Sequence, residues 1–298
     1  MAKTGYSTKV IQQNEVVVNL TEKCNNRCLN CPNDDNFLRR CISDVEVEKF
    51  IDENVSGETD RVTFIGGEPT ISKNFFDSIK KVRMLSNKAI IQINSNGRMF
   101  CYGWFVDKLA EYGVDKFDIH VALYGHFPEL HDELTFIRGS YKQTVQGIIN
   151  LLNRGFSVQI RTIVSNLNYK YLPDIGRMMV EKFKGKISKF NFVGMDIIGN
   201  AKKNEKVLAV SHLKIAPYIE KTIDVLNSNG IYCNVHLLPK GIFKKRYHDF
   251  AIKSGCVDGA FTDSFGCVEC IYHDSCPRMM KSYVAIFGNK EHLPCIKC

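Results

Sequence analysis

Short apolar runs alternate with amphipathic segments along most of the chain, from about Val16 to about Val235. The runs contain many β-branched residues, which is typical of buried strands. We expect strands at residues 16–20, 61–65, 89–93, 117–123, 157–164, 189–195 and 231–235. We expect helices between them, near residues 43–51, 72–82, 104–112, 140–152, 172–183 and 217–227. Ser43 and Glu46 have the spacing of a capping box, and Ser72 is a candidate cap for the next helix.

Strands that alternate with helices of this length predict βαβ units and a parallel sheet. The number of units favours an α/β fold built as a partial (β/α)6 TIM-like barrel, whose function lies at the carboxyl ends of the strands. The alternation ends near residue 240, where glycine, cysteine and aromatic residues become frequent. We therefore expect a barrel domain at 1–239 and a small cysteine-rich extension at 240–298.

The charge and hydropathy of the chain limit the location and the partners that we expect for it. Forty Lys and Arg against 32 Asp and Glu give a net charge of +8, but the basic residues form only short runs, such as 80–81 and 244–246. Short runs are typical of solvated faces, so we do not expect a nucleic-acid partner. The polar start of the chain lacks the pattern of a secretory signal, and no apolar run has the roughly 18 residues of a membrane span. We expect a cytoplasmic protein without a membrane partner.

Twelve cysteines are many for a cytoplasmic protein, where closely spaced cysteines favour metal binding. Cys24, Cys28 and Cys31 follow the first strand within eight residues. Three thiolates suit an iron–sulfur cubane with one iron left open to a small chelating molecule. Zinc is the alternative, and it would need a fourth ligand from elsewhere.

Polar motifs also follow the next two expected strands. Gly66, Gly67, Glu68 and Pro69 follow the second, where glycines permit a close approach of the backbone to a ligand, or form only a tight turn. The third expected strand is followed by Asn94-Ser95-Asn96-Gly97, which also has the composition of a turn. Arg161 interrupts an apolar strand, so it needs an anionic partner, either a carboxylate of the protein or a ligand.

Together, the cysteine spacing and the Gly-Gly-Glu-Pro motif resemble the radical S-adenosylmethionine (SAM) superfamily. The resemblance implies a 4Fe–4S cluster on the three cysteines, with SAM on the open iron. SAM would then be cleaved to methionine and a 5′-deoxyadenosyl radical that abstracts a substrate hydrogen. It also implies SAM contacts from residues 66–69, with Glu68 as acceptor for the amino group, and from Ser95 and Asn96. The SAM carboxylate is then a candidate partner of Arg161, beside a carboxylate of the protein core. One departure is Asn30, because the family usually has an aromatic or apolar residue before the third cysteine.

The C-terminal cysteines resemble the SPASM and twitch extensions of radical SAM enzymes, which carry auxiliary 4Fe–4S clusters. Cys267, Cys270 and Cys276 have a C-x2-C-x5-C spacing, and Cys256 would complete four ligands. Zinc remains the alternative, because Cys267 and Cys270 also pair with Cys295 and Cys298 as in a zinc ribbon.

The substrate is less constrained by the sequence. His120, Tyr124 and Asp196 lie on or just after expected strands and are candidates to face a substrate, or are core and capping residues. Scattered matches, among them Asn96-Gly97-Arg98 and Arg138-Gly139-Ser140, resemble the His-Xaa-Ser system maturase group. This resemblance implies a ribosomally made peptide as substrate and a reducing partner such as flavodoxin or ferredoxin. The alternatives are the same chemistry on a small metabolite or nucleotide, and a non-catalytic zinc or iron–sulfur module that binds nucleic acid.

Overall fold

The computed structural model describes residues 9–12, 14–34, 42–253, 260–263, 266–291 and 294. The expected metal ligand Cys256, and also Cys295 and Cys298, lie outside these ranges. The chain forms two compact units: unit 1 comprises Met1–Cys28, Asn33–Leu123 and His131–Ile160, and unit 2 comprises Leu29–Pro32, Tyr124–Leu130 and Arg161–Cys298. The expected boundary near residue 240 falls inside unit 2 and stays a prediction.

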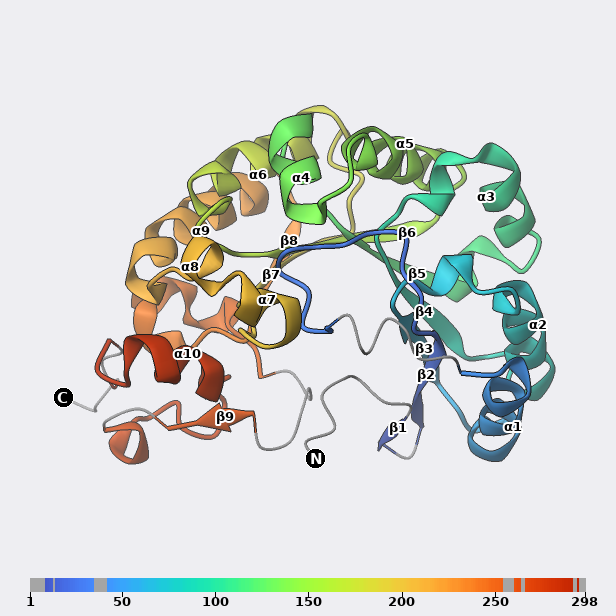
Figure 1. Cartoon of the computed structure of the whole chain (residues 1–298), viewed down its shortest axis with the longest axis horizontal. Coiled ribbons are helices and arrows are strands. Elements are labelled where there is room, and N and C mark those ends of the chain that lie inside the picture. Colours follow the sequence, from blue (N-terminus) through green and yellow to red (C-terminus); the bar gives the residue numbers. More distant parts are fainter. Residues whose placement is uncertain are drawn as a thin grey trace. The chain divides into compact units, whose positions relative to one another are not determined.

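The main sheet contains eight strands, hydrogen-bonded in the order of the chain (Figure 1). The strands are β1 (Lys9–Gln12), β2 (Glu15–Thr21), β3 (Arg61–Gly66), β4 (Ile90–Ser95), β5 (Phe117–Ala122), β6 (Ser157–Ile163), β7 (Lys189–Val193) and β8 (Tyr232–His236). β1 is antiparallel to β2. The pairs β2–β3, β3–β4, β4–β5 and β7–β8 are parallel. The α/β class is therefore confirmed, with seven parallel strands and their helices in a partial TIM-like fold.

Helices lie between the successive parallel strands, as expected, and a further helix follows the last strand. They are α1 (Asp44–Asn54), α2 (Phe75–Leu85), α3 (Gly103–Ala110), α4 (Pro128–Thr135), α5 (Ser140–Asn153), α6 (Leu172–Glu181), α7 (Gly199–Lys203), α8 (Glu205–Leu208), α9 (His212–Asn227) and α10 (Lys281–Phe287). The Ser43–Glu46 capping box of α1 is confirmed. The expected Ser72 cap is wrong, because α2 begins at Phe75 and the Ser72 hydroxyl donates to the carbonyl of Leu20. None of the described helices is long and apolar enough to cross a bilayer.

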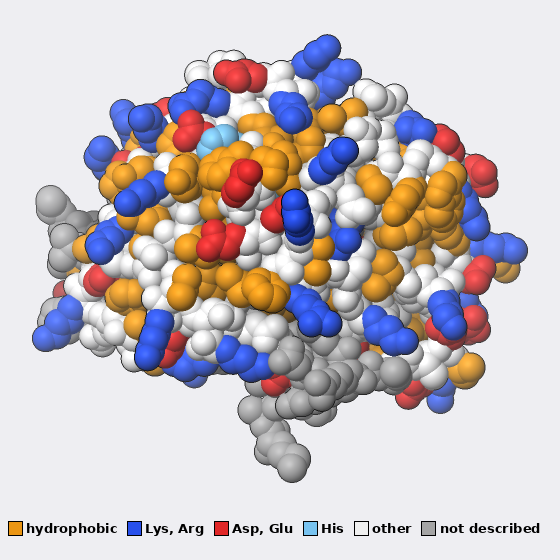
Figure 2. All heavy atoms as spheres, turned by 45° about the horizontal axis from the view of Figure 1, so that its top comes forward, with side chains coloured by type: hydrophobic (Ala, Val, Ile, Leu, Met, Phe, Trp, Pro, Cys, Tyr) orange, Lys and Arg blue, Asp and Glu red, His pale blue; other side chains and the backbone are white. Residues whose placement is uncertain are grey.

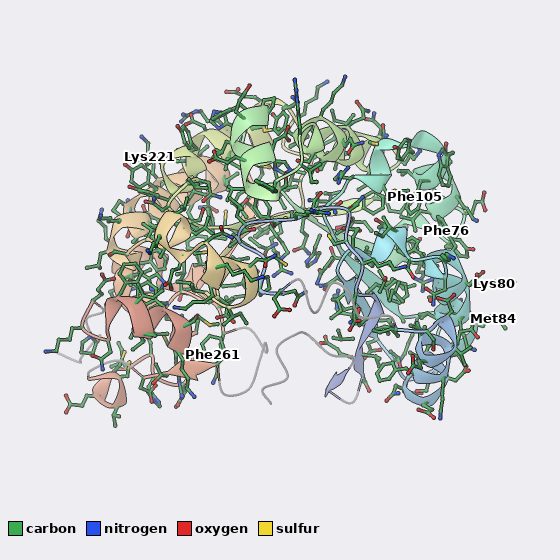
Figure 3. All side chains as sticks on the ribbon, in the orientation of Figure 1. Phe76, Lys80, Met84, Phe105, Lys221 and Phe261 are labelled. Atoms are coloured by element: carbon green, nitrogen blue, oxygen red, sulfur yellow. The ribbon has the colours of Figure 1, made fainter. Side chains whose placement is uncertain are left out.

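The strands of unit 1 alternate between two kinds of side chain. Buried residues such as Phe64, Ile93 and Ile119 share one face, where aromatic rings of α2 and α3 join the core. Phe76 and Phe105 illustrate this packing, with ring centroids 5.0 Å apart (Figure 3). The opposite face is half-buried and mostly polar, which is unusual because barrel interiors are normally filled with Val, Ile and Leu. Its polar members are Thr63, Gln92, Asn94, Asp118, His120 and Gln159.

Unit 2 contains the C-terminal segment as well as β7 and β8. A short hairpin of β9 (Phe261–Thr262) and β10 (Met279–Met280) leads into α10. Met279, Met280 and Tyr283 are buried in one cluster with Val193 at the end of β7 and Leu237 after β8. The C-terminal segment is thus packed against the carboxyl ends of its unit's strands, where function is expected.

Candidate functional site

The Gly-Gly-Glu-Pro motif contacts the chain just before the first cysteine. Gly67 N donates to the carbonyl of Thr21 and Glu68 N to that of Lys23, both at 2.8 Å. A Cβ atom on Gly66 would lie 2.1 Å from the Thr21 oxygen, and one on Gly67 would lie 2.4 Å from the Lys23 oxygen. The two glycines are therefore required by the close approach of the chain's own backbone at the end of β2.

Glu68 joins the loops that follow β3 and β4. Its side chain is 1% exposed, and Oε1 accepts hydrogen bonds from Thr70 N (3.1 Å) and Ser95 Oγ (2.8 Å). Oε2 accepts from Asn96 N at 2.6 Å. Burial raises the pKa of Glu68 above its ordinary value, although the hydrogen bonds oppose this effect. Both oxygens are thus used within the protein, so a role as acceptor for the SAM amino group stays a prediction.

The loop after β4 reaches the residues between the first two cysteines. Asn96 Nδ2 donates to Asn25 Oδ1 at 2.6 Å, and Thr144 Oγ1 of α5 donates to the carbonyl of Asn96 at 2.9 Å. Gly147 of the same helix lies against this loop, since a Cβ there would be 2.3 Å from the carbonyl oxygen of Gly97. The loop is therefore held between α5 and the first cysteine motif.

Arg98 makes the most extensive contact with that motif, and the sequence did not single it out as a site residue. Its Nη1 donates to Asn26 Oδ1 at 2.8 Å and to the carbonyl oxygen of Asn25. Its Nε donates to Gln143 Oε1 of α5 at 2.6 Å. Two signals in the sequence point to it: this arginine directly follows a strand-end Asn-Gly pair, and Asn96-Gly97-Arg98 is among the matches to the maturase group.

Two further contacts order residues 24–28. Arg27 N donates to the carbonyl oxygen of Thr135 at 3.0 Å. Asn26 N points at Cys24 Sγ, with a distance of 3.3 Å between the two atoms. Unit 1 therefore holds Cys24 and Cys28, both half-buried, in a loop supported by segments that follow β3, β4 and β5.

Cys31 is half-buried in unit 2, where its carbonyl oxygen accepts a hydrogen bond from Ala201 N at 3.0 Å. The neighbouring Asn30 is 1% exposed, and its amide oxygen and nitrogen have no hydrogen-bond partner among the described residues. In unit 1, Asn19 Oδ1 and Asn33 Oδ1 are orphaned in the same way. Buried polar atoms without partners cost about 1–3 kcal/mol each. In each unit, such atoms are able to hydrogen-bond a polar ligand.

Within the described part of the chain, no three Cys, His, Asp or Glu side chains converge as a site for a single metal ion. A cubane makes a different demand, because each cysteine ligates a separate iron. Three cysteines within eight residues, half-buried and flanked by orphaned polar atoms, fit the ligand set of an open cubane better than a zinc site.

Asp118 is the centre of a hydrogen-bonded group on the polar face of the unit 1 sheet. Its carboxylate accepts from Gln159 Nε2 (2.9 and 3.0 Å), contacts His120 Nε2 at 3.1 Å and lies 3.4 Å from Arg61 Nη1. Burial by itself would raise the pKa of Asp118, but its bonds to His120 and Gln159 and the charge of Arg61 bring that pKa below its ordinary value. His120 is thus on a half-buried polar surface, and its role in facing a substrate stays a prediction.

The period of two along a strand predicts that His120 and Tyr124 share one face, and this prediction is wrong because Tyr124 lies beyond the end of β5. β5 ends at Ala122, because its ladder with β4 ends where β4 ends, at Ser95 paired with Val121. Tyr124 lies in unit 2 and is 6% exposed. Its carbonyl oxygen accepts a hydrogen bond from Asn168 Nδ2 at 3.2 Å.

In unit 2, Asp196 contacts α10. Its Oδ1 accepts from Ser282 Oγ at 2.7 Å, and the same hydroxyl accepts from Ile197 N at 3.1 Å. Burial raises the pKa of Asp196, against the effect of the Ser282 bond. Arg161 is half-buried on β6, and its guanidinium has neither a hydrogen bond nor an ion pair with the residues that the structure describes. Its need for an anionic partner is therefore unmet within that part of the protein.

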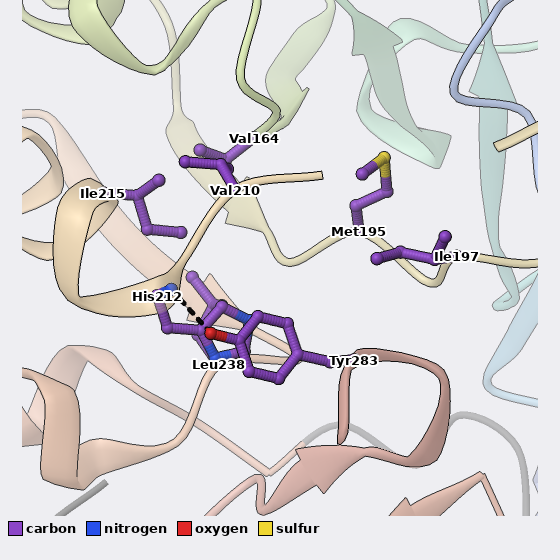
Figure 4. Close-up of a pocket in the computed structure, with 8 residues that line it drawn as sticks. All are labelled: Val164, Met195, Ile197, Val210, His212, Ile215, Leu238 and Tyr283. Carbon is purple, nitrogen blue, oxygen red and sulfur yellow. Dashed lines mark hydrogen bonds between the residues drawn. The ribbon is translucent and has the colours of Figure 1, made fainter. Parts of the chain in front are cut away.

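A small apolar pocket lies beside Asp196 (Figure 4). The ring of His212 is stacked on that of Tyr283 with centroids 3.5 Å apart, and His212 N donates to the Tyr283 hydroxyl at 2.9 Å. Burial, together with a hydrogen bond to Glu291, raises the pKa of Tyr283. These contacts of Tyr283 hold α10 against its unit beside the pocket. Its lining is Val164, Met195, Ile197, Val210, His212, Ile215, Leu238 and Tyr283.

The C-terminal cysteines Cys267, Cys270 and Cys276 are half-buried. Cys276 Sγ accepts a hydrogen bond from Lys240 N at 3.4 Å. Burial raises the pKa of the Cys276 thiol; backbone N–H groups of Arg278 and Lys240 oppose this, and the charges of Cys267 and Cys270 add to it. The three thiols are thus near enough to interact electrostatically, while the fourth expected ligand, Cys256, lies outside the described residues.

Comparison with known proteins identifies the family. The sequence model of the Radical SAM superfamily matches residues 18–179, which is more than half of the chain. This chain belongs to the radical SAM superfamily. The radical SAM family uses a 4Fe–4S cluster and SAM.

Individual relatives of this radical SAM chain act on different substrates. Fe-coproporphyrin III synthase of Methanosarcina barkeri is 26% identical over 63% of the chain, which spans less than half (45%) of that relative. GTP 3′,8-cyclase of Clostridium perfringens strain SM101 is 26% identical over 78% of the chain and 79% of its own length. The crystal structure of Streptococcus suis SuiB bound to precursor peptide SuiA has a TM-score of 0.60 at 16% identity, covering 75% of this chain and 48% of SuiB. Because the identity is only 16%, the likeness to SuiB shows that the fold is shared and nothing more.

Proposed function

We propose that this chain is a radical SAM enzyme that binds a 4Fe–4S cluster on Cys24, Cys28 and Cys31 and removes a hydrogen atom from a peptide. When bound, the cluster supplies the electron that cleaves SAM to methionine and a 5′-deoxyadenosyl radical. The protein's own residues hold the cysteines, orient SAM and substrate, and exclude stray hydrogen donors.

The observation that supports this proposal is the hydrogen bonding among three strand-end loops of unit 1. Residues 66–69 contact the end of β2, Glu68 contacts Ser95 and Asn96, and Arg98 contacts the backbone between Cys24 and Cys28. The three motifs of the sequence resemblance thus form one connected structure at the carboxyl ends of β2, β3 and β4.

The cofactor roles divide between loop shape and direct side-chain contact. Glu68 and Ser95 use their side chains within the protein, and the N–H groups of Gly67, Glu68 and Asn96 also donate to protein acceptors. Residues 66–69, Ser95 and Asn96 would therefore bind SAM mainly by shaping the loops around it. Arg161 would bind the SAM carboxylate, a role supported by its half-buried position and by the absence of a partner among the described residues. His120, positioned by Asp118, and Asp196 would face the substrate.

The C-terminal segment would hold an auxiliary 4Fe–4S cluster on Cys256, Cys267, Cys270 and Cys276, with zinc as the alternative. The C-x2-C-x5-C spacing and the half-buried position of the three described thiols support a shared site. A flavodoxin or ferredoxin would reduce the first cluster, in keeping with a cytoplasmic location, where disulfides are rare and thiols stay available for iron.

A peptide substrate is supported by the fold shared with SuiB, whose structure contains a precursor peptide. A small metabolite or nucleotide is the second candidate, because a GTP 3′,8-cyclase matches this chain over nearly four fifths of both lengths. A nucleic-acid-binding module is less favoured. Lys and Arg side chains are scattered among acidic and hydrophobic ones on the face shown in Figure 2, whereas nucleic-acid sites gather basic residues in a stripe or patch.

The proposal is tested by anaerobic reconstitution with iron and sulfide, followed by dithionite and SAM. We expect 5′-deoxyadenosine from the intact chain, none from Cys28→Ala, and a loss of about four iron atoms per chain in that variant. Cys101→Ala is the matched control, since Cys101 is also half-buried in unit 1 but outside the motif. Equal 5′-deoxyadenosine from Cys28→Ala and Cys101→Ala would contradict the assignment. Faster 5′-deoxyadenosine formation with GTP than with short synthetic peptides would favour the second candidate.

A further inference from the structure

Arg98 differs from the other arginines of unit 1 because its acceptors lie within the cysteine motif. Nη1 donates to the carbonyl oxygen of Asn25 and to Asn26 Oδ1, acceptors 73 and 72 positions away in the chain. Nε donates to Gln143 Oε1, which holds the guanidinium from α5. One side chain thus connects the loop after β4, a helix and the turn between Cys24 and Cys28.

These hydrogen bonds are expected to stabilise the turn more than ordinary surface contacts would. The Arg98 side chain is half-buried, and a charged donor strengthens a hydrogen bond to roughly twice that of a neutral pair. A planar guanidinium has donors fixed in several directions, which a lysine ammonium on a flexible stem does not reproduce. Arg98 can therefore hold Asn25, Asn26 and Gln143 in one arrangement.

The remaining contacts of the turn are compatible with this role. Asn96 Nδ2 holds the Asn25 side chain, and Thr135 accepts from Arg27 N. Arg98 contacts both the backbone and a side chain within the turn. Loss of its guanidinium would release the Asn25 carbonyl, whose orientation determines how the chain leaves Cys24.

We propose that Arg98 is a positioning residue that orders the turn between Cys24 and Cys28 before the cluster is inserted. The proposal rests on the proposed function for the group that the turn receives, but the ordering itself is a property of the metal-free chain. An ordered turn would reduce the number of conformations that the cysteines sample before they ligate the cluster. It would also slow the loss of iron once the cluster is bound.

The test compares Arg98→Met and Arg98→Lys with Arg83→Met. Arg83 is a matched control, because its half-buried guanidinium also donates to two backbone carbonyls of unit 1, those of Ala89 (2.6 Å) and Lys116 (2.9 Å), outside the motif. The first measurement is hydrogen exchange of the amides of residues 24–28 in the metal-free protein. We expect exchange about ten- to a hundredfold faster in Arg98→Met, the range for losing one or two charged hydrogen bonds. Arg83→Met should leave this segment unchanged.

The second measurement is the rate at which a chelator removes iron after anaerobic reconstitution. We expect release several-fold faster for Arg98→Met than for Arg83→Met, with Arg98→Lys between Arg98→Met and the unmodified protein. Arg98→Lys keeps the charge, so it preserves a testable protein if Arg98→Met folds poorly.

Equal exchange of residues 24–28 in the Arg98→Met and Arg83→Met variants would overturn the proposal, and so would equal rates of iron release. Failure of the proposed function has a different signature. If the intact chain binds iron but forms no 5′-deoxyadenosine, while Arg98→Met still loosens the turn and speeds iron release, the positioning role is supported and the SAM chemistry is not.

Discussion

Between Cys24 and Cys28 the backbone is held by side chains from distant loops, whereas between Cys267 and Cys276 it is held largely by turns of its own. Arg98 and Asn96 reach the first segment from about 70 positions away. In the second segment, Cys270 N donates to the carbonyl of Cys267 and Cys276 N to that of Tyr272. Lys240 N, 36 positions from Cys276, is a distant donor to its sulfur.

This difference indicates two ways of preparing a metal site. A loop fixed by the surrounding fold can be ordered before its metal arrives. A segment held by local turns gains much of its order from the metal, as small metal-dependent domains do. The first cysteine group should therefore respond mainly to changes in its protein contacts, and the second mainly to the presence of its metal.

The largest expected effect is on the support of the first loop. Glu68→Ala removes the acceptor of Asn96 N, Thr70 N and Ser95 Oγ in a buried place, so we expect it to lower the free energy of unfolding by about 3 kcal/mol or more. Asp196→Ala loses one bond to Ser282 in a half-buried place and should cost about 1 kcal/mol. Urea unfolding measures the loss of stability in both variants. Equal losses would contradict the expectation that the Glu68 contacts stabilise the protein more than the Asp196 contact does.

Metal removal should affect the second segment more than the first. We expect chelation to speed hydrogen exchange of residues 267–276 by about a hundredfold, because metal-binding free energy is folding free energy in such segments. Exchange of residues 117–122 in β5 should stay the same, which makes this strand the internal control. Unchanged exchange at 267–276 after complete loss of metal would argue that this segment is ordered by the protein alone.

The smallest expected effect is the pH dependence contributed by Glu68. Because its pKa is raised in the folded protein, Glu68 contributes stability that is fully present below its ordinary pKa of 4.5 and is lost as pH rises through the raised value. Glu68→Gln removes this contribution. The difference in unfolding free energy between the intact protein and Glu68→Gln should therefore grow as pH falls from 7 toward about 4.5. A difference that shrinks over this range would indicate a lowered pKa.

Most of the strands and helices of unit 1 could be predicted because each carries its own pattern. The runs at 61–65 and 117–123 became β3 and β5, and Ser43 formed its capping box. The Ser72 cap failed because a distant acceptor, the Leu20 carbonyl, competes for its hydroxyl. α4 was missed, since Pro128–Thr135 carries only two buried apolar residues among polar ones. A local sequence pattern predicts local structure, but it fails where a tertiary contact determines the conformation.

The candidate site shows the same limit. Cysteine spacing and the Gly-Gly-Glu-Pro motif identified the superfamily, which the family match confirmed. The internal use of Glu68 could not be predicted, because its partners Ser95 and Asn96 lie 27 and 28 positions away. Arg98 was missed for the same reason. Sequence motifs mark the residues near the chemistry, whereas the contacts that position them depend on which strand ends are adjacent in the sheet.

Gly147 illustrates how far from the cysteines that dependence extends. The helix that contains it brings no charged group to the motif, yet a methyl group on Gly147 would lie only 2.3 Å from the carbonyl oxygen of Gly97. The separation between a helix axis and a strand-end loop is thereby fixed at direct main-chain contact. Helix placement in this protein is therefore part of the geometry available to a cofactor, even where the helix itself carries no ligand.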